Sequence, residues 1–163
     1  MTPAWSADWA WSLPLIAFTL AIHVAAAIGL ALLVLRTRLQ FEKRPRGMAS
    51  SALFAIAAFG AAGWALAILH GLEAAIWAGV YLLLGATDNW ADAMLYSVDS
   101  MTTRGASGLK LDSHWKMMGA LEAANGVLLF GVSTAFLAAF LTEAWTKFRK
   151  LENERADKYV APS

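Results

Sequence analysis

The sequence predicts an all-α membrane protein with three membrane-spanning helices, and with a re-entrant helix and loop between the second and third. Of its 163 residues, 59% are apolar and only 15% are charged, which is typical of membrane proteins. Residues 96–111 are too polar to span a bilayer and too apolar for an ordinary surface loop. Because polar backbone at membrane depth must be surrounded by protein or water, this segment between two spans indicates a pathway through the bilayer.

The composition argues against several other classes of protein. The chain has no cysteine, which excludes disulfides and thiolate metal sites. Its net charge of +1 gives no electrostatic basis for binding nucleic acid, and it carries no phosphate-binding loop, dinucleotide motif or nucleophile elbow. We therefore expect no enzyme activity, no cofactor and no nucleic-acid partner.

An interfacial segment and the first span are expected at the start of the chain. Residues 1–13 carry three tryptophans, whose rings favour the membrane–water interface. Residues 14–35 are apolar and would form a helix of about 33 Å, enough for a hydrocarbon core of about 30 Å. No basic region precedes this run, so a retained helix is expected rather than a signal peptide. Its one ionisable residue, His23, either bonds to a neighbouring helix or acts as a ligand or proton relay.

A basic loop at residues 36–46 sets the expected topology. The loop holds five arginine or lysine residues against one glutamate, and cytoplasmic loops are rich in such residues. The N-terminus is then outside. The mixed-charge tail at residues 143–163 is expected in the cytoplasm, helical at first and then loose.

The second apolar run, residues 48–84, is longer than one span requires. As a single helix it would measure about 55 Å, so it is either one long helix or two pieces that break near Gly71. Two full passes would put the basic loop and the basic tail on opposite sides, so we expect one pass. His70 and Glu73 are three residues apart and share a helical face, which should point into the protein or into water.

A short helix is expected at residues 88–102, before the last span. Thr87 or Asp88 would cap its start, and Asp92 would complement the helix dipole.

The last span is expected at residues 115–141. Glu122 and Asn125 share one of its faces. Three glycines would let neighbouring helices approach closely: Gly119, Gly126 and Gly131.

Three groups of residues resemble a known family. The segment after the short helix has Thr102, Thr103 and Gly105 in an ungapped Thr-Thr-x-Gly pattern. The second run contains His-x-x-Glu followed by tryptophan and tyrosine, at His70, Glu73, Trp77 and Tyr81. The last span contributes Glu122, Gly126 and the run Ser133, Thr134 and Ala135. Together these resemble potassium channels of the small bacterial ion-channel family, in which the pattern opens the filter Thr-Thr-Val-Gly-Tyr-Gly-Asp.

The resemblance implies a fold, an assembly and a location. It implies a potassium-channel-like pore domain at residues 48–142, with an outer helix at 48–84, a pore helix at 88–102, a filter at 102–108 and an inner helix at 115–141. Residues 14–47 are then an additional helix with its basic loop. The assembly would be a homotetramer in the bacterial inner membrane, with the lipid bilayer and inorganic ions as its partners.

The filter departs from the family pattern at four positions. Arg104, Ala106, Ser107 and Gly108 stand where the family has Val, Tyr, Gly and Asp. Potassium selectivity needs backbone carbonyls in a Gly-Tyr-Gly geometry, so we do not expect it here. The resemblance then implies a weakly selective cation channel or an anion pathway.

The direction of the Arg104 side chain decides whether a cation or an anion pathway is expected. If the position points behind the filter as in the family, Arg104 meets Asp99, five residues earlier, and the pair braces the filter of a cation pathway. If Arg104 lines the pore, four guanidinium groups would favour anions.

Two alternatives to a channel, a non-conducting membrane protein and a metalloenzyme, stay open. The scaffold is either a conducting pore or a non-conducting structural or regulatory membrane protein. The polar residues of the spans would either hydrogen-bond between helices or form a metalloenzyme site from His23, His70, Glu73 and Glu122. The His-x-x-Glu unit occurs only once, which favours hydrogen bonding without a metal.

Overall fold

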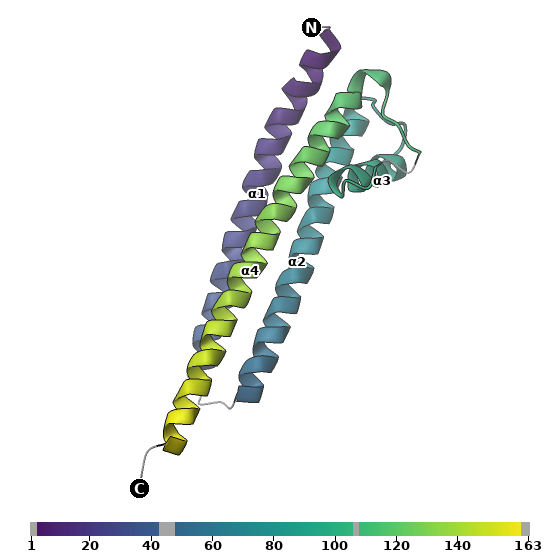
Figure 1. The fold of residues 1–163 in the computed structure, drawn as a ribbon. Coiled ribbons are helices and arrows are strands. Elements are labelled where there is room, and N and C mark those ends of the chain that lie inside the picture. Colours follow the sequence, from purple (N-terminus) through teal and green to yellow (C-terminus); the bar gives the residue numbers. More distant parts are fainter. Residues whose placement is uncertain (1–2, 43–47, 106–107, 161–163) are drawn as a thin grey trace.

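The fold is a bundle of three long helices with one short helix lying against it (Figure 1). The computed structural model describes residues 3–42, 48–105 and 108–160. Their elements, all helical, are α1 (Pro3–Glu42), α2 (Met48–Leu83), α3 (Trp90–Met101), the short 3₁₀ helix η1 (Ser113–Trp115) and α4 (Lys116–Val160). Three of them, α1, α2 and α4, are long and apolar enough to cross a membrane, which confirms the predicted all-helical class and its three candidate spans.

Helix α1 is longer than the expected first span. It starts at Pro3 and continues through Pro14, so residues 3–13 are part of the same helix as the span. A helix satisfies its backbone groups internally, which explains why the apolar chain stays helical despite the hydrogen bond that a proline removes.

The face of α1 that packs into the bundle is polar. Asp8, Ser12, Thr19 and His23 are all buried, and their spacings of four, seven and four residues place them on one side. Large apolar side chains such as Phe18 and Ile28 are exposed on the outside. This arrangement is expected in lipid, where apolar side chains face outward and polar side chains form hydrogen bonds between helices.

Helix α2 is continuous from Met48 to Leu83, so the alternative of two pieces broken near Gly71 is not realised. Most of its buried residues lie in its second half, where Trp77, Ala78 and Tyr81 form a core with Met118 of α4 and Ala93 of α3. The core therefore sits at the end of the bundle where α3 packs.

Helix α3 starts two residues later than expected. Its N-cap is Asn89, whose side-chain oxygen accepts a hydrogen bond from the backbone N–H of Asp92 at 2.9 Å. Thr87 and Asp88 therefore do not cap the helix, since Asn89 satisfies the free N–H group.

Two glycines of α4 make room for α3. A Cβ atom at Gly126 would overlap the backbone of Met101, and one at Gly119 would overlap the ring and hydroxyl of Tyr96. A Cβ at Gly131 would meet no atom of the described residues within 4 Å. The expected close approach of helices therefore occurs at the first two glycines, which lie two turns apart along α4.

The two ends of the segment that contains α3 lie next to each other. The backbone N–H of Asp112 donates to the carbonyl of Ala86 at 3.1 Å, which joins the two ends of residues 86–112. Asp112 then caps η1 by accepting from the N–H of His114. These bonds with His114 lower the pKa of the exposed Asp112 carboxyl below its usual value.

Helix α4 extends well past the expected end of the last span, to Val160, so much of the predicted tail is helical. Near its middle, Glu143 forms an ion pair with Arg38 of α1. Arg38 is near the C-terminal end of α1, and this end of α1 lies toward the end of the bundle opposite α3 (Figure 1). The basic end of α1 and the charged part of α4 therefore lie at the same end of the bundle.

Candidate functional site

Apart from Asn125, the polar residues predicted from the sequence form three separate groups in the structure. One surrounds His23 between α1, α2 and α4, one surrounds Glu122 between α2, α3 and α4, and one lies at the C-terminal end of α3.

The first group connects all three long helices. The carboxylate of Glu73 accepts from Nδ1 of His23 at 2.9 Å, and Nε2 of the same ring contacts Ser133 Oγ at 3.0 Å. His70 also contacts Ser133 Oγ through Nε2, at 3.1 Å, and its Nδ1 lies 3.4 Å from Glu73 Oε2. His23 and Glu73 are fully buried. His23 therefore bonds to both neighbouring long helices, as one of its two interpretations expects.

The second group fixes α3 to its neighbours. Glu122 of α4 accepts hydrogen bonds from the hydroxyls of Tyr81, at 2.5 Å, and of Ser97. Ser97 is also within 2.8 Å of the carbonyl of Ala74 in α2. Glu122 and Ser97 are fully buried. One carboxylate thus joins α2, α3 and α4, and it does not lie with the two histidines as the metalloenzyme reading required.

Asn125 lies outside the groups around His23 and Glu122. Its side-chain amide donates to the hydroxyl of Thr19 at 2.9 Å, which links α4 to α1.

The third group is the turn that ends α3. The N–H of Thr103 donates to Ser100 O at 2.9 Å, and the N–H of Arg104 donates to Asp99 O at 3.1 Å. This pattern is a Schellman cap, in which the residue at the position of Thr103 takes a left-handed conformation. Thr103 has a φ of 55°, which is a strained value for a β-branched residue.

The predicted pair of Arg104 and Asp99 is present. Arg104 Nη2 lies 2.9 Å from Asp99 Oδ1, and the Asp99 side chain is only 3% exposed. The Arg104 side chain is 63% exposed, so it covers Asp99 from the outside of the chain. The ion pair therefore neutralises a buried carboxylate beside the turn.

The rest of the predicted filter lies next to this turn. Thr102, Thr103, Gly105 and Gly108 are exposed, and both glycines have positive φ values, of 81° and 88°. Such values are open to glycine at no steric cost. Ala106 and Ser107 lie outside the residues that the structure describes.

Several polar residues that complete these groups were not selected from the sequence. Ser97 and Thr19 are single hydroxyl residues inside helices, where a hydroxyl often bonds only to its own backbone. For Thr19, the four- and seven-residue spacing with Asp8, Ser12 and His23 is a signal that could have identified it.

Comparison of the chain with protein-family models, with curated proteins and with solved structures gives no match. The resemblance to small potassium channels therefore rests on the residues of the motifs themselves.

Proposed function

We propose that the chain is the pore-forming subunit of a homotetrameric ion channel that conducts cations with weak selectivity. The observation that carries this proposal is the turn at residues 102–105, which exposes two threonines and a glycine at the end of a short helix braced between two candidate spans.

The path of residues 86–112 supports a re-entrant segment. Its two ends are joined by the hydrogen bond between Asp112 and Ala86, whereas Met101, in its middle, packs on Gly126. Gly126 lies 10 residues after the start of α4, about 15 Å along the helix. A segment that enters to this depth and returns would bring its polar turn into the membrane interior, where it must be surrounded by protein or water.

The buried bonds of α3 support a turn that is held in place. Selectivity requires groups in a fixed arrangement along the ion path. Ser97 and Glu122 fix α3 on α2 and α4, and the Asp99–Arg104 pair fixes the turn on α3. These contacts are of the kind that would orient a filter.

The ion pair favours cations over anions as the permeant species. An unpaired ring of four Arg104 side chains would repel cations, but each guanidinium here faces a carboxylate at 2.9 Å. The pair adds no net charge to the turn, and the two exposed threonines carry hydroxyl oxygens, which are ligands that suit hard cations.

The tetramer follows from the resemblance and suits the exposed residues. A pore on a symmetry axis brings the same turn from every copy to one place. Thr102, Thr103 and Arg104 are exposed in the single chain and are available for such an arrangement.

Ion flux into liposomes tests the proposal. Purified protein would be reconstituted and compared under potassium, sodium and chloride gradients, as wild type, Arg104→Lys and Arg104→Val. We expect potassium and sodium flux of similar size in the wild type and in Arg104→Lys, with little chloride flux. A chloride preference that disappears in Arg104→Val would instead place Arg104 in the pathway. Absence of flux from assembled protein would favour the non-conducting scaffold.

A further inference from the structure

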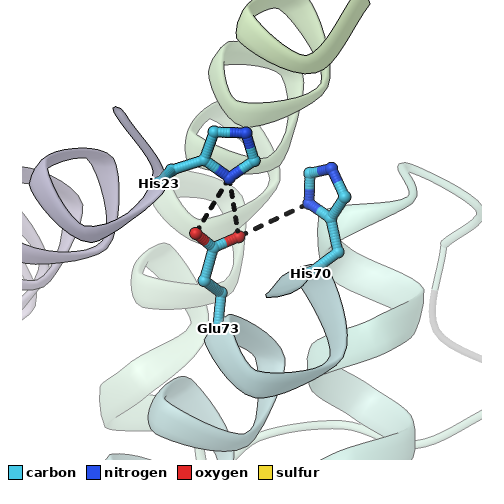
Figure 2. A group of neighbouring side chains, drawn as sticks. All are labelled: His23, His70 and Glu73. Atoms are coloured by element: carbon cyan, nitrogen blue, oxygen red, sulfur yellow. Dashed lines mark hydrogen bonds and ion pairs between the residues drawn. The ribbon is translucent and has the colours of Figure 1, made fainter. Parts of the chain in front are cut away.

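The group around His23 has a feature that its role in joining helices does not explain. His23, His70 and Glu73 each direct a ligand atom toward one point between α1 and α2 (Figure 2). These atoms all lie within 4.8 Å of one another. The Glu73 carboxylate is 2.9 Å from His23 Nδ1 and 3.4 Å from His70 Nδ1.

The hydrogen atoms available do not satisfy this arrangement. Each neutral imidazole has one N–H, and Ser133 has one O–H. The two Nδ1 atoms face Glu73, and the two Nε2 atoms face Ser133 Oγ. If both Nδ1 atoms carry the proton, two bare Nε2 atoms compete for the single hydroxyl hydrogen. If one of the two rings carries its proton on Nε2 instead, the lone pair on Nδ1 of that ring faces the Glu73 carboxylate, which cannot donate a hydrogen bond. One ring nitrogen always lacks a partner.

That nitrogen is identified in the structure. Nδ1 of His70 is buried and has no hydrogen-bond partner among the residues that the structure describes, although it is directed at the Glu73 carboxylate. A buried polar atom without a partner destabilises the folded protein. A cation between the three side chains would remove this cost.

We propose that His23, His70 and Glu73 bind a divalent transition-metal ion, with Ser133 as the residue that orients both imidazoles. With the metal bound to both Nδ1 atoms, both Nε2–H groups donate to Ser133 Oγ, whose two lone pairs accept them. Metal-binding histidines ordinarily donate their second N–H in this way. Every ring nitrogen is then satisfied.

The donor set selects the class of metal. Two imidazole nitrogens and one carboxylate suit zinc, cobalt, nickel or iron, whereas calcium and magnesium prefer sites made of oxygen atoms. Metal–ligand distances of about 2.0–2.2 Å separate tetrahedral ligands by about 3.4 Å. Oε2 of Glu73 lies 3.3 Å from Nδ1 of His23 and 3.4 Å from Nδ1 of His70, and both distances are close to this value.

The site would connect the additional helix to the pore-domain helices. His23 comes from α1, His70 and Glu73 come from α2, and Ser133 comes from α4. A bound ion would therefore hold all three long helices together at one point. This inference does not depend on conduction, because metal binding is measured without any ion flux.

Cobalt(II) and zinc binding to the purified full-length protein tests the site. Equilibrium dialysis would give the number of ions bound per chain, and the visible absorption of cobalt(II) would report its coordination. We expect one ion per chain, with the intense bands of a four-coordinate site, and displacement of cobalt by zinc. His70→Ala should weaken zinc binding by at least 10–100-fold, because it removes one of three protein ligands.

The third histidine of the chain provides a matched control. His114 is exposed and bonds to Asp112 outside the proposed site, so His114→Ala should bind zinc as the wild type does. Glu73→Gln, which keeps the size of the side chain, provides a second variant and should also lose binding. Substoichiometric binding by the wild type, or equal affinity in wild type and His70→Ala, would overturn the proposal. In that case an additional proton on one of the two imidazole rings, and not a metal ion, would satisfy the remaining ring nitrogen.

Discussion

Thr103 holds a backbone conformation that β-branched residues rarely adopt. Its φ of 55° is imposed by the cap of α3, where a glycine is the usual residue. The strain costs about 1–2 kcal/mol and persists because the surrounding contacts determine the turn. Residues in such conformations are found at functional sites, which agrees with the proposed role of this turn in conduction.

Substitution of Thr103 by glycine should relieve this strain. We expect Thr103→Gly to raise the free energy of unfolding by about 1 kcal/mol, because glycine takes positive φ without a steric penalty. Thr102→Gly is the matched control: Thr102 has a φ of −82° and donates to Val98 O at 2.7 Å, so this change should destabilise the protein by about 1 kcal/mol. Unfolding in denaturing detergent, followed by tryptophan fluorescence, measures both. Destabilisation by Thr103→Gly would contradict the strained cap.

Some of these residues could be predicted from the sequence and others could not. The pair of Arg104 and Asp99 could be predicted because the resemblance directs residue 104 behind the filter, where Asp99 can meet it. The conformation of Thr103 could not, because a threonine carries no signal for positive φ as a glycine does. Ser133 was noted only as part of a motif, and its contact with both histidines depends on how three helices pack.

At the scale of elements, the position of α3 depends on two glycines of α4. Met101 packs on Gly126 and Tyr96 packs on Gly119, so the short helix lies along about two turns of the long one. The spans themselves could be predicted from the length of their apolar runs. The ends of the helices could not, because the polar residues before the first span and after the last one continue the helices they flank.

Enlargement of Gly126 should displace α3. We expect Gly126→Ala to destabilise the protein by about 1–3 kcal/mol, because the new methyl group meets backbone atoms of Met101 that cannot move without shifting the helix. Gly131→Ala, where a Cβ meets nothing, should be neutral or stabilise by up to about 1 kcal/mol through better helix propensity. Equal effects of the two changes on detergent unfolding would show that α3 does not rest on Gly126. A loss of flux in Gly126→Ala alone would link this packing to conduction.

At the scale of the molecule, the polar inner face and apolar outer face of α1 suit a chain surrounded by lipid. Thr19 and His23 bond to α4 and α2, while Leu32 and Ile28 are exposed. The contact of Arg38 with Glu143 brings the basic end of α1 beside α4. One face of the membrane would then carry the basic loop and the C-terminal part of the chain, as the excess of arginine and lysine predicts for the cytoplasmic side.

Cysteine labelling tests this orientation. The chain has no native cysteine, so Thr37→Cys creates a single reactive site, at an exposed position beside Arg38. We expect an impermeant thiol reagent to label it only after the cells are opened. A cysteine at the exposed Ser113, toward the opposite end of the last candidate span, is the control and should react in intact cells. Labelling of Thr37→Cys in intact cells would reverse the topology.

The reversal potential of the purified protein in a planar bilayer tests the central claim most directly. With unequal concentrations of potassium chloride on the two sides, the sign of this potential shows whether cations or anions carry the current. We predict that the reversal potential is displaced from zero toward the potassium equilibrium potential. It should change little when sodium replaces potassium. A reversal potential on the chloride side, or no current from tetrameric protein, would contradict the proposal of a weakly selective cation channel.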